Sequence, residues 1–211
     1  MHRPRELSAR DRAVLSSDVV FAGTWMPERG PFFRKLVECS VPLRIFGPRW
    51  NRAREFAVLK PYTYVAPLGD EEYVKAIVSA KIALGLVSKA NLDVRTTGSL
   101  EIPAIGTLFC AQRTPDPTSP CIGTGEAVFW DTPEECARLC LDLLRDPERI
   151  SRIASAGHRR AHLNRNFNED LLTRMIDAAM ALRDRRAGTQ PDPLFRTTVR
   201  SRRYQVQSKG S

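Results

Sequence analysis

The sequence of 211 residues contains no long apolar run and little cysteine or histidine. Its longest strongly apolar stretch, residues 102–111, is about half as long as a helix that crosses a membrane. The N-terminus carries Arg3 and Arg5 without an apolar segment behind them, so a secretory signal is not expected. These absences predict a cytoplasmic protein.

The five cysteines are an odd number, and none forms a Cys-x-x-Cys pair, so no disulfide framework is expected. Cys136 and Cys140 are four residues apart on an expected helix, as two metal ligands can be. No neighbouring pair completes a tetrahedral site, so reduced thiols buried among apolar side chains are favoured. His158 and His162 repeat this spacing, and we expect them on a solvated helix face. No metal is predicted.

The positive charge is concentrated at the C-terminus. The whole chain carries a formal +9, and residues 183–211 hold eight basic and two acidic residues, a net +6. We therefore expect an N-terminal extension over 1–16, one folded domain over 17–186 and a basic, disordered tail over 187–211. A nucleic-acid partner is not expected, although weak attachment of the tail to nucleic acid stays open as an alternative.

Short apolar runs alternate with segments of helical spacing. Hydrophobic residues make up 42% and charged residues 27%, which is ordinary for one globular domain. Strands are expected at 18–23, 41–46, 82–87, 107–111 and 127–130, and helices at about 29–37, 70–79, 98–106, 133–145, 147–157 and 169–183. This alternation predicts an α/β fold with a doubly wound parallel sheet of about five strands, helices on both faces and a C-terminal helical segment. Ligands of such sheets bind beyond the carboxyl ends of the strands.

A polar loop before the expected helix at 98–106 is the first candidate site. Thr97, Gly98 and Ser99 present backbone N–H groups and hydroxyls at the positive end of a helix dipole, where a diphosphate can bind. Glu101, one turn inside, can reach a ribose hydroxyl, and Arg95 can pair with a phosphate. Together these features suit the donor site of a nucleotide sugar. A plain N-cap, a capping carboxylate and a solvated arginine remain the alternatives.

The turn after the first strand is the second candidate. Gly23 and Thr24 are small enough to let phosphates approach the backbone, and Arg29 can supply countercharge. The alternative is an ordinary tight turn with a solvated arginine.

An ordered series of motifs resembles the C-terminal domain of GT-B glycosyltransferases, and most closely the CgeB-like branch, named after a spore-maturation protein. The motifs are residues 20–25 (VFAGTW) with 28–29 (ER), 45–47 (IFG) with Trp50, 99–104 (SLEIPA), 125–130 (GEAVFW), 133–135 (PEE), 146–147 (DP) and 156–158 (AGH). The resemblance covers about residues 18–176 and implies a single Rossmann-like domain.

The resemblance also implies roles for two acids. Glu101 takes the place of the acid that holds the donor ribose, and Asp93, eight residues earlier, resembles the first acid of the family's E-x7-E pattern, which faces the sugar. The implied reaction transfers a sugar from a nucleoside-diphosphate sugar to an acceptor, and the lack of an Asp-x-Asp pair agrees with metal independence. The acceptor-binding site is expected to lie on a separate N-terminal half of the enzyme or on a homo-oligomeric partner. A non-catalytic nucleotide-sugar-binding or interaction module is the alternative.

Overall fold

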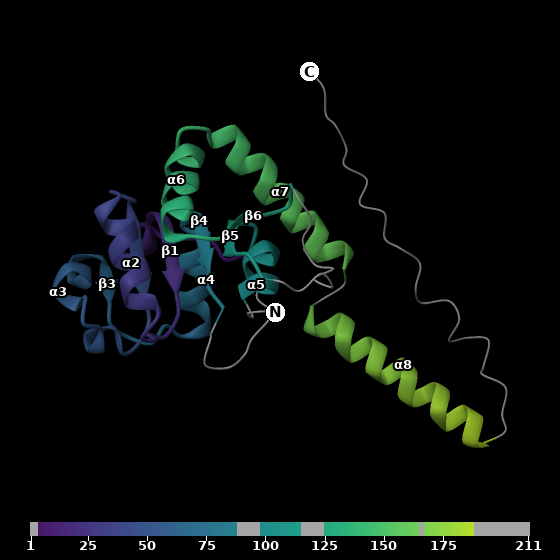
Figure 1. Cartoon of the computed structure of the whole chain (residues 1–211). Coiled ribbons are helices and arrows are strands. Elements are labelled where there is room, and N and C mark those ends of the chain that lie inside the picture. The colour runs from purple at the N-terminus through teal and green to yellow at the C-terminus, as the bar shows by residue number, and fades with distance from the viewer. Residues whose placement is uncertain (1–3, 88–97, 115–124, 165–166, 188–211) are drawn as a thin grey trace. The chain divides into compact units, whose positions relative to one another are not determined.

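The computed structural model describes residues 4–87, 98–114, 125–164 and 167–187. Its centre is a sheet of six parallel strands in the order β3-β2-β1-β4-β5-β6 (Figure 1). The strands are β1 (Ser17–Ala22), β2 (Leu43–Phe46), β3 (Thr63–Tyr64), β4 (Ala80–Gly85), β5 (Leu108–Gln112) and β6 (Val128–Trp130). This order is that of a Rossmann-type sheet, so the predicted fold class is confirmed.

Helices cover both faces of the sheet. They are α1 (Ala9–Leu15), α2 (Arg29–Glu38), α3 (Phe56–Leu59), α4 (Asp70–Val78), α5 (Gly98–Ile105), α6 (Pro133–Leu144) and α7 (Pro147–Leu163), with short 3-10 turns at Trp50–Arg52 and Lys60–Tyr62. Residues up to 167 form one compact unit, and α8 (Asn168–Ala187) belongs to a second unit that begins at residue 168. In the part of the chain that the structure describes, no helix combines the length and apolarity needed to cross a membrane.

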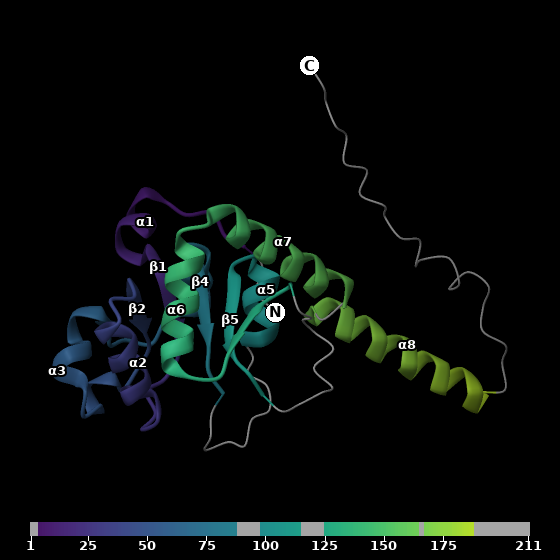
Figure 2. The ribbon, with the colours of Figure 1, turned by 45° about the horizontal axis from the view of Figure 1, so that its top comes forward.

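One face of the sheet is rich in aromatic rings. Here α2 and α6 pack on the strands, as Figure 2 shows, and the Phe21 and Phe33 rings lie 4.8 Å apart between centroids. Phe32 stacks on Trp130 at 4.7 Å, which joins α2 to the end of β6. Aromatic pairs at such distances contribute beyond their buried area. This side therefore holds α2 firmly against the sheet.

The opposite face is mainly aliphatic. Leu15 of α1, Ile77 of α4 and Ile102 of α5 pack there against Val20 and Phe109 of the strands. At one end, α7 lies across α5, where Ala104, Ala161 and Phe167 form a small cluster of their own. Because α4 and α5 share this face, the start of α5 is held by packing with α4 as well as with the sheet.

Several short elements were not predicted. Residues 49–64, where no helix or strand was expected, contain two 3-10 turns, α3 and the two-residue strand β3, which adds a sixth strand to the five expected. The segment expected as an extension contains α1, where Ser8 and Asp11 form a reciprocal capping box. All of these elements are short, so their hydrophobic periodicity is weak, and they depend on contacts with the rest of the domain.

Candidate functional site

The strand order fixes where a ligand crevice can form. From β1 the chain builds β2 and β3 on one side, and it then returns to place β4 on the other side of β1. The connections that leave the carboxyl ends of β1 and β4 therefore run in opposite directions, which makes this position the topological switch point of the sheet. Gly23 and Thr24 directly follow β1, and α5 is the helix that follows β4.

The backbone of the β1–α2 turn is fixed by the neighbouring strand. The Gly23 N–H donates to the Phe46 carbonyl at 2.8 Å, and the Gly23 carbonyl accepts from Trp50 Nε1 at 2.9 Å. Gly47, with a φ of +137°, packs its backbone directly on the Gly23 carbonyl, where a Cβ would collide. Both backbone polar groups of Gly23 are thus already hydrogen-bonded within the protein.

Arg29 closes the same turn from the first residue of α2. Its side chain is buried, with Arg29 7% exposed, and its Nη1 donates to the Thr24 carbonyl at 2.7 Å. The guanidinium carbon lies 5.2 Å from the centre of the Phe21 ring, a cation–π arrangement. Burial lowers the pKa of Arg29, and the charge of Glu28 partly offsets this. The alternative of a solvated arginine is therefore wrong.

Three buried polar atoms in this turn are unsatisfied. Trp25 Nε1, Glu28 Oε1 and Arg29 Nε are each shielded from solvent and have no hydrogen-bond partner among the described residues. Buried polar atoms are normally paired, and each exception calls for an explanation, such as a bound water or ligand. Two of the three are N–H donors, which suit an anionic oxygen.

The first turn of α5 carries the other described candidates. Gly98, Ser99 and Glu101 are all partly exposed at its N-terminal end. Glu101 is hydrogen-bonded to the side chain of Tyr73 on α4. Burial, then the charge of Glu101 and this hydrogen bond, raise the pKa of Tyr73 far above its usual value, so the phenol keeps its proton.

The structure thus gathers the predicted residues into two sets. Gly23, Thr24 and Arg29 are in mutual contact after β1, and Gly98, Ser99 and Glu101 share one turn of α5 after β4. Both sets belong to connections that leave the carboxyl edge at the switch point. The remaining candidates, Asp93, Arg95 and Thr97, lie outside the described residues.

Sequence reasoning missed several polar contacts near these sets. It singled out neither Tyr73 nor the Nε1 of Trp50 as partners of candidate residues, because both contacts join segments far apart in the chain. His158, expected on a solvated face, is half-buried instead, and its Nδ1 lies 3.1 Å from the Pro103 carbonyl of α5. His162 is exposed, as expected.

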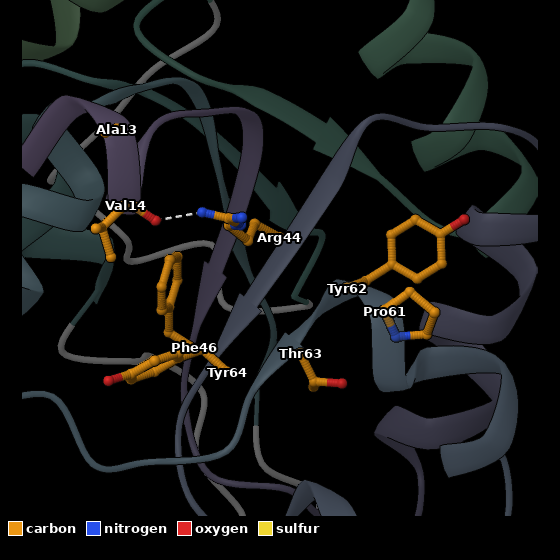
Figure 3. Close-up of a pocket in the computed structure, with 8 residues that line it drawn as sticks. All are labelled: Ala13, Val14, Arg44, Phe46, Pro61, Tyr62, Thr63 and Tyr64. Carbon is orange, nitrogen blue, oxygen red and sulfur yellow. Dashed lines mark hydrogen bonds between the residues drawn. The ribbon is translucent and has the colours of Figure 1, made fainter.

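A separate pocket of about 220 Å³ lies between the end of α1, the edge strand β3 and its neighbour β2. Figure 3 shows Arg44 of β2 directed toward α1, where its Nη1 donates to the Val14 carbonyl. Phe46 and Tyr64 line the same pocket, with ring centroids 5.9 Å apart. None of the predicted site residues lines it, so this pocket is distinct from the switch point.

The strand order and helix arrangement define a Rossmann-like domain of the GT-B type. The chain belongs to the glycosyl transferase-like family, whose model matches residues 29–177. The matched region includes all of α5 and Glu101, and it begins after Gly23 and Thr24. No curated protein matches the sequence.

Solved structures share the fold at low identity. HepE from Anabaena in complex with UDP-glucose has a TM-score of 0.62 at 10% identity, over 83% of this chain and 53% of that one. Sucrose-phosphate synthase from Thermosynechococcus elongatus has a TM-score of 0.58 at 16% identity, over 84% of this chain and 50% of that one. The C-terminal domain of the glycosyl transferase group 1 family protein LpcC from Francisella tularensis has a TM-score of 0.54 at 9% identity, over 76% of this chain and 94% of that one. The chain thus spans about half the length of the first two and nearly all of that C-terminal domain.

Proposed function

We propose that this chain is the donor-binding half of a cytoplasmic GT-B glycosyltransferase of the CgeB-like branch. The single observation that carries the proposal is the switch point. There, the connections that follow β1 and β4 leave the same edge of the sheet; the first leads to the buried Arg29, and the second leads to the start of α5 with Glu101. The family match and the neighbouring structures, one of them solved with UDP-glucose, support this choice of ligand.

The start of α5 would bind the diphosphate of the donor. Backbone N–H groups of Thr97, Gly98 and Ser99 lie at or before the first turn of this helix, and Arg95 adds positive charge. These groups would also stabilise the charge that develops on the diphosphate as it leaves the anomeric carbon, without a metal. In this proposal Asp93 faces the sugar.

Glu101 would accept hydrogen bonds from the ribose. Its hydrogen bond from Tyr73 fixes the carboxylate and supports this role. A carboxylate has about four acceptor positions, so one bond from a phenol is compatible with others from a sugar hydroxyl.

The β1–α2 turn would form the opposite wall of the donor site. Because both backbone groups of Gly23 are hydrogen-bonded within the protein, Gly23 would act by its small size and not as a donor, and the small Thr24 would likewise leave room for the phosphates. The unsatisfied N–H groups of Trp25 and Arg29 could then reach a phosphate oxygen.

A calorimetric titration of the chain with UDP-, GDP- and dTDP-sugars tests the proposal. We expect the sugars of one of these three nucleotides to bind. Glu101→Gln should weaken that binding about 10- to 100-fold, as loss of a charged hydrogen-bond acceptor does. Glu134→Gln is the matched control, because Glu134 is also an acid in a first helical turn and pairs with Lys35 at 3.3 Å. Failure of all three donors to bind, or equal losses in both variants, would reject the donor site.

Turnover separates the enzyme from a binding module. The chain spans about half the length of two of its structural neighbours, and in this proposal a separate N-terminal half or a homo-oligomeric partner supplies the acceptor site. Slow hydrolysis of the bound donor, abolished in Glu101→Ala, would support an enzyme. Donor binding without hydrolysis or transfer would support a non-catalytic module.

A further inference from the structure

Three cysteines from two distant segments meet in the core of the domain. Cys110 lies on β5, and Cys136 and Cys140 lie one turn apart on α6, which packs over that part of the sheet. All three residues are fully buried, and their sulfur atoms lie within 4.8 Å of one another. Sequence spacing predicted only the helical pair, so the fold adds the third sulfur.

The surroundings of the three sulfurs are apolar. The cluster belongs to the core that also contains Trp130 and Leu143. Hydrogen bonding with Cys136 and Cys140, and then burial, raise the pKa of Cys110 well above its usual value.

We propose that Cys110, Cys136 and Cys140 form a three-sulfur binding site for a trivalent thiophilic centre, of which arsenic(III) is the probe. Sulfur ligands select soft centres. Structural zinc almost always takes four ligands, and among the described residues the cluster offers three.

Net charge distinguishes the candidate centres. Three thiolates leave a net charge of −1 around zinc(II) and −2 around copper(I), and an apolar core strongly disfavours a buried unpaired charge. Three thiolates around arsenic(III) are neutral. The trivalent centre therefore fits this core best.

The reaction balances without an oxidant or reductant. Arsenite, As(OH)₃, exchanges its three hydroxyl groups for three sulfurs: three As–O and three S–H bonds break, three As–S bonds form, and three water molecules leave. Arsenite binding by three thiols therefore releases no protons, whereas zinc binding by three thiols releases three. Because the sulfurs are buried, entry requires α6 to open locally, so uptake should be slow.

Native mass spectrometry of the reduced full chain incubated with arsenite is the main test. We expect a mass gain of one arsenic atom less three hydrogens and, at 100 times the dissociation constant, a rise in Tm of about 5–10 °C. Between pH 6 and 8 the affinity for arsenite should stay constant, because no protons are exchanged, whereas the affinity for zinc should rise. No uptake, or a gain that corresponds to loss of only two hydrogens, would overturn the proposal.

Serine variants supply the controls. Cys140→Ser should lose arsenic binding at least tenfold, whereas Cys39→Ser should keep it, because Cys39 is half-buried after α2 and outside the cluster. Undiminished binding by a folded Cys140→Ser variant would overturn the site. Displacement of arsenite by equimolar zinc in the wild-type chain would overturn the choice of a trivalent centre. If Cys140→Ser does not fold, the mass of the arsenic-bound wild-type chain still tests the proposal, because it shows whether three hydrogens or only two are lost on binding.

Discussion

The two connections that flank the switch point are built differently. The β1–α2 turn is tied to its neighbours by the backbone bonds of Gly23, the indole of Trp50 and the buried guanidinium of Arg29. The start of α5 is partly exposed, and a tyrosine on α4 holds its acid. In the proposed donor site, the first connection would therefore act mainly as a rigid wall, while the second would supply most of the groups that bind the ligand.

Gly47→Ala should have the largest effect, because it breaks the rigid wall. A Cβ at this position would collide with the Gly23 carbonyl, and the φ of +137° is unfavourable for any side chain. We expect a loss of about 3 kcal/mol in the free energy of unfolding, measured with urea.

Gly69→Ala is the control for that substitution. Gly69 has a φ of −66°, and the nearest atom to an added Cβ is Glu72 Oε2 at 3.7 Å. We expect a change within about 1 kcal/mol. Equal losses in the two variants would mean that the Gly23–Gly47 contact has no special role.

Trp50→Phe should have the next largest effect. The substitution removes the hydrogen bond to the Gly23 carbonyl and part of a fully buried ring that packs edge-on against Phe33. We expect a loss of about 2 kcal/mol in stability, from the cavity and the unpaired carbonyl. Phe56→Leu, in the short helix α3 nearby, should cost less because that side chain is only half-buried.

Tyr73→Phe should have the smallest effect and concerns the second connection. It removes the hydroxyl that bonds to Glu101 and leaves the ring in place. We expect donor affinity, measured by calorimetry, to fall about two- to fivefold, in line with one hydrogen bond. Tyr64→Phe, on the edge strand β3, should leave it unchanged. A larger loss of stability than of affinity in Tyr73→Phe would show that the contact serves folding alone.

Local signals explain why much of the fold was predictable. Thr132 before Pro133 and Asp146 before Pro147 predicted two helix starts, and both side chains accept the expected N-cap bonds, at 3.1 and 2.9 Å. Short apolar runs located β1, β4 and β5. Each of these signals lies within a few residues of the element that it specifies.

Long-range contacts account for what was not predictable. The strand β3 consists of two residues and exists through its pairing with β2. The burial of Arg29 depends on Phe21 and Thr24, and the third sulfur of the thiol cluster comes from a strand 26 residues before its nearest partner. The sequence correctly placed Glu101 in the first turn of its helix, but its partner Tyr73 belongs to another helix and could not be predicted from nearby residues.

The close contact between Gly23 and Gly47 has a consequence for engineering. A side chain at Gly47 would collide with the backbone of Gly23, and a side chain at Gly23 would collide with the Phe21 ring, so neither position can be enlarged to reshape the wall. A library that aims to alter the proposed donor site would therefore be better directed at the partly exposed turn around Gly98 and Ser99, with Gly23 and Gly47 left unchanged.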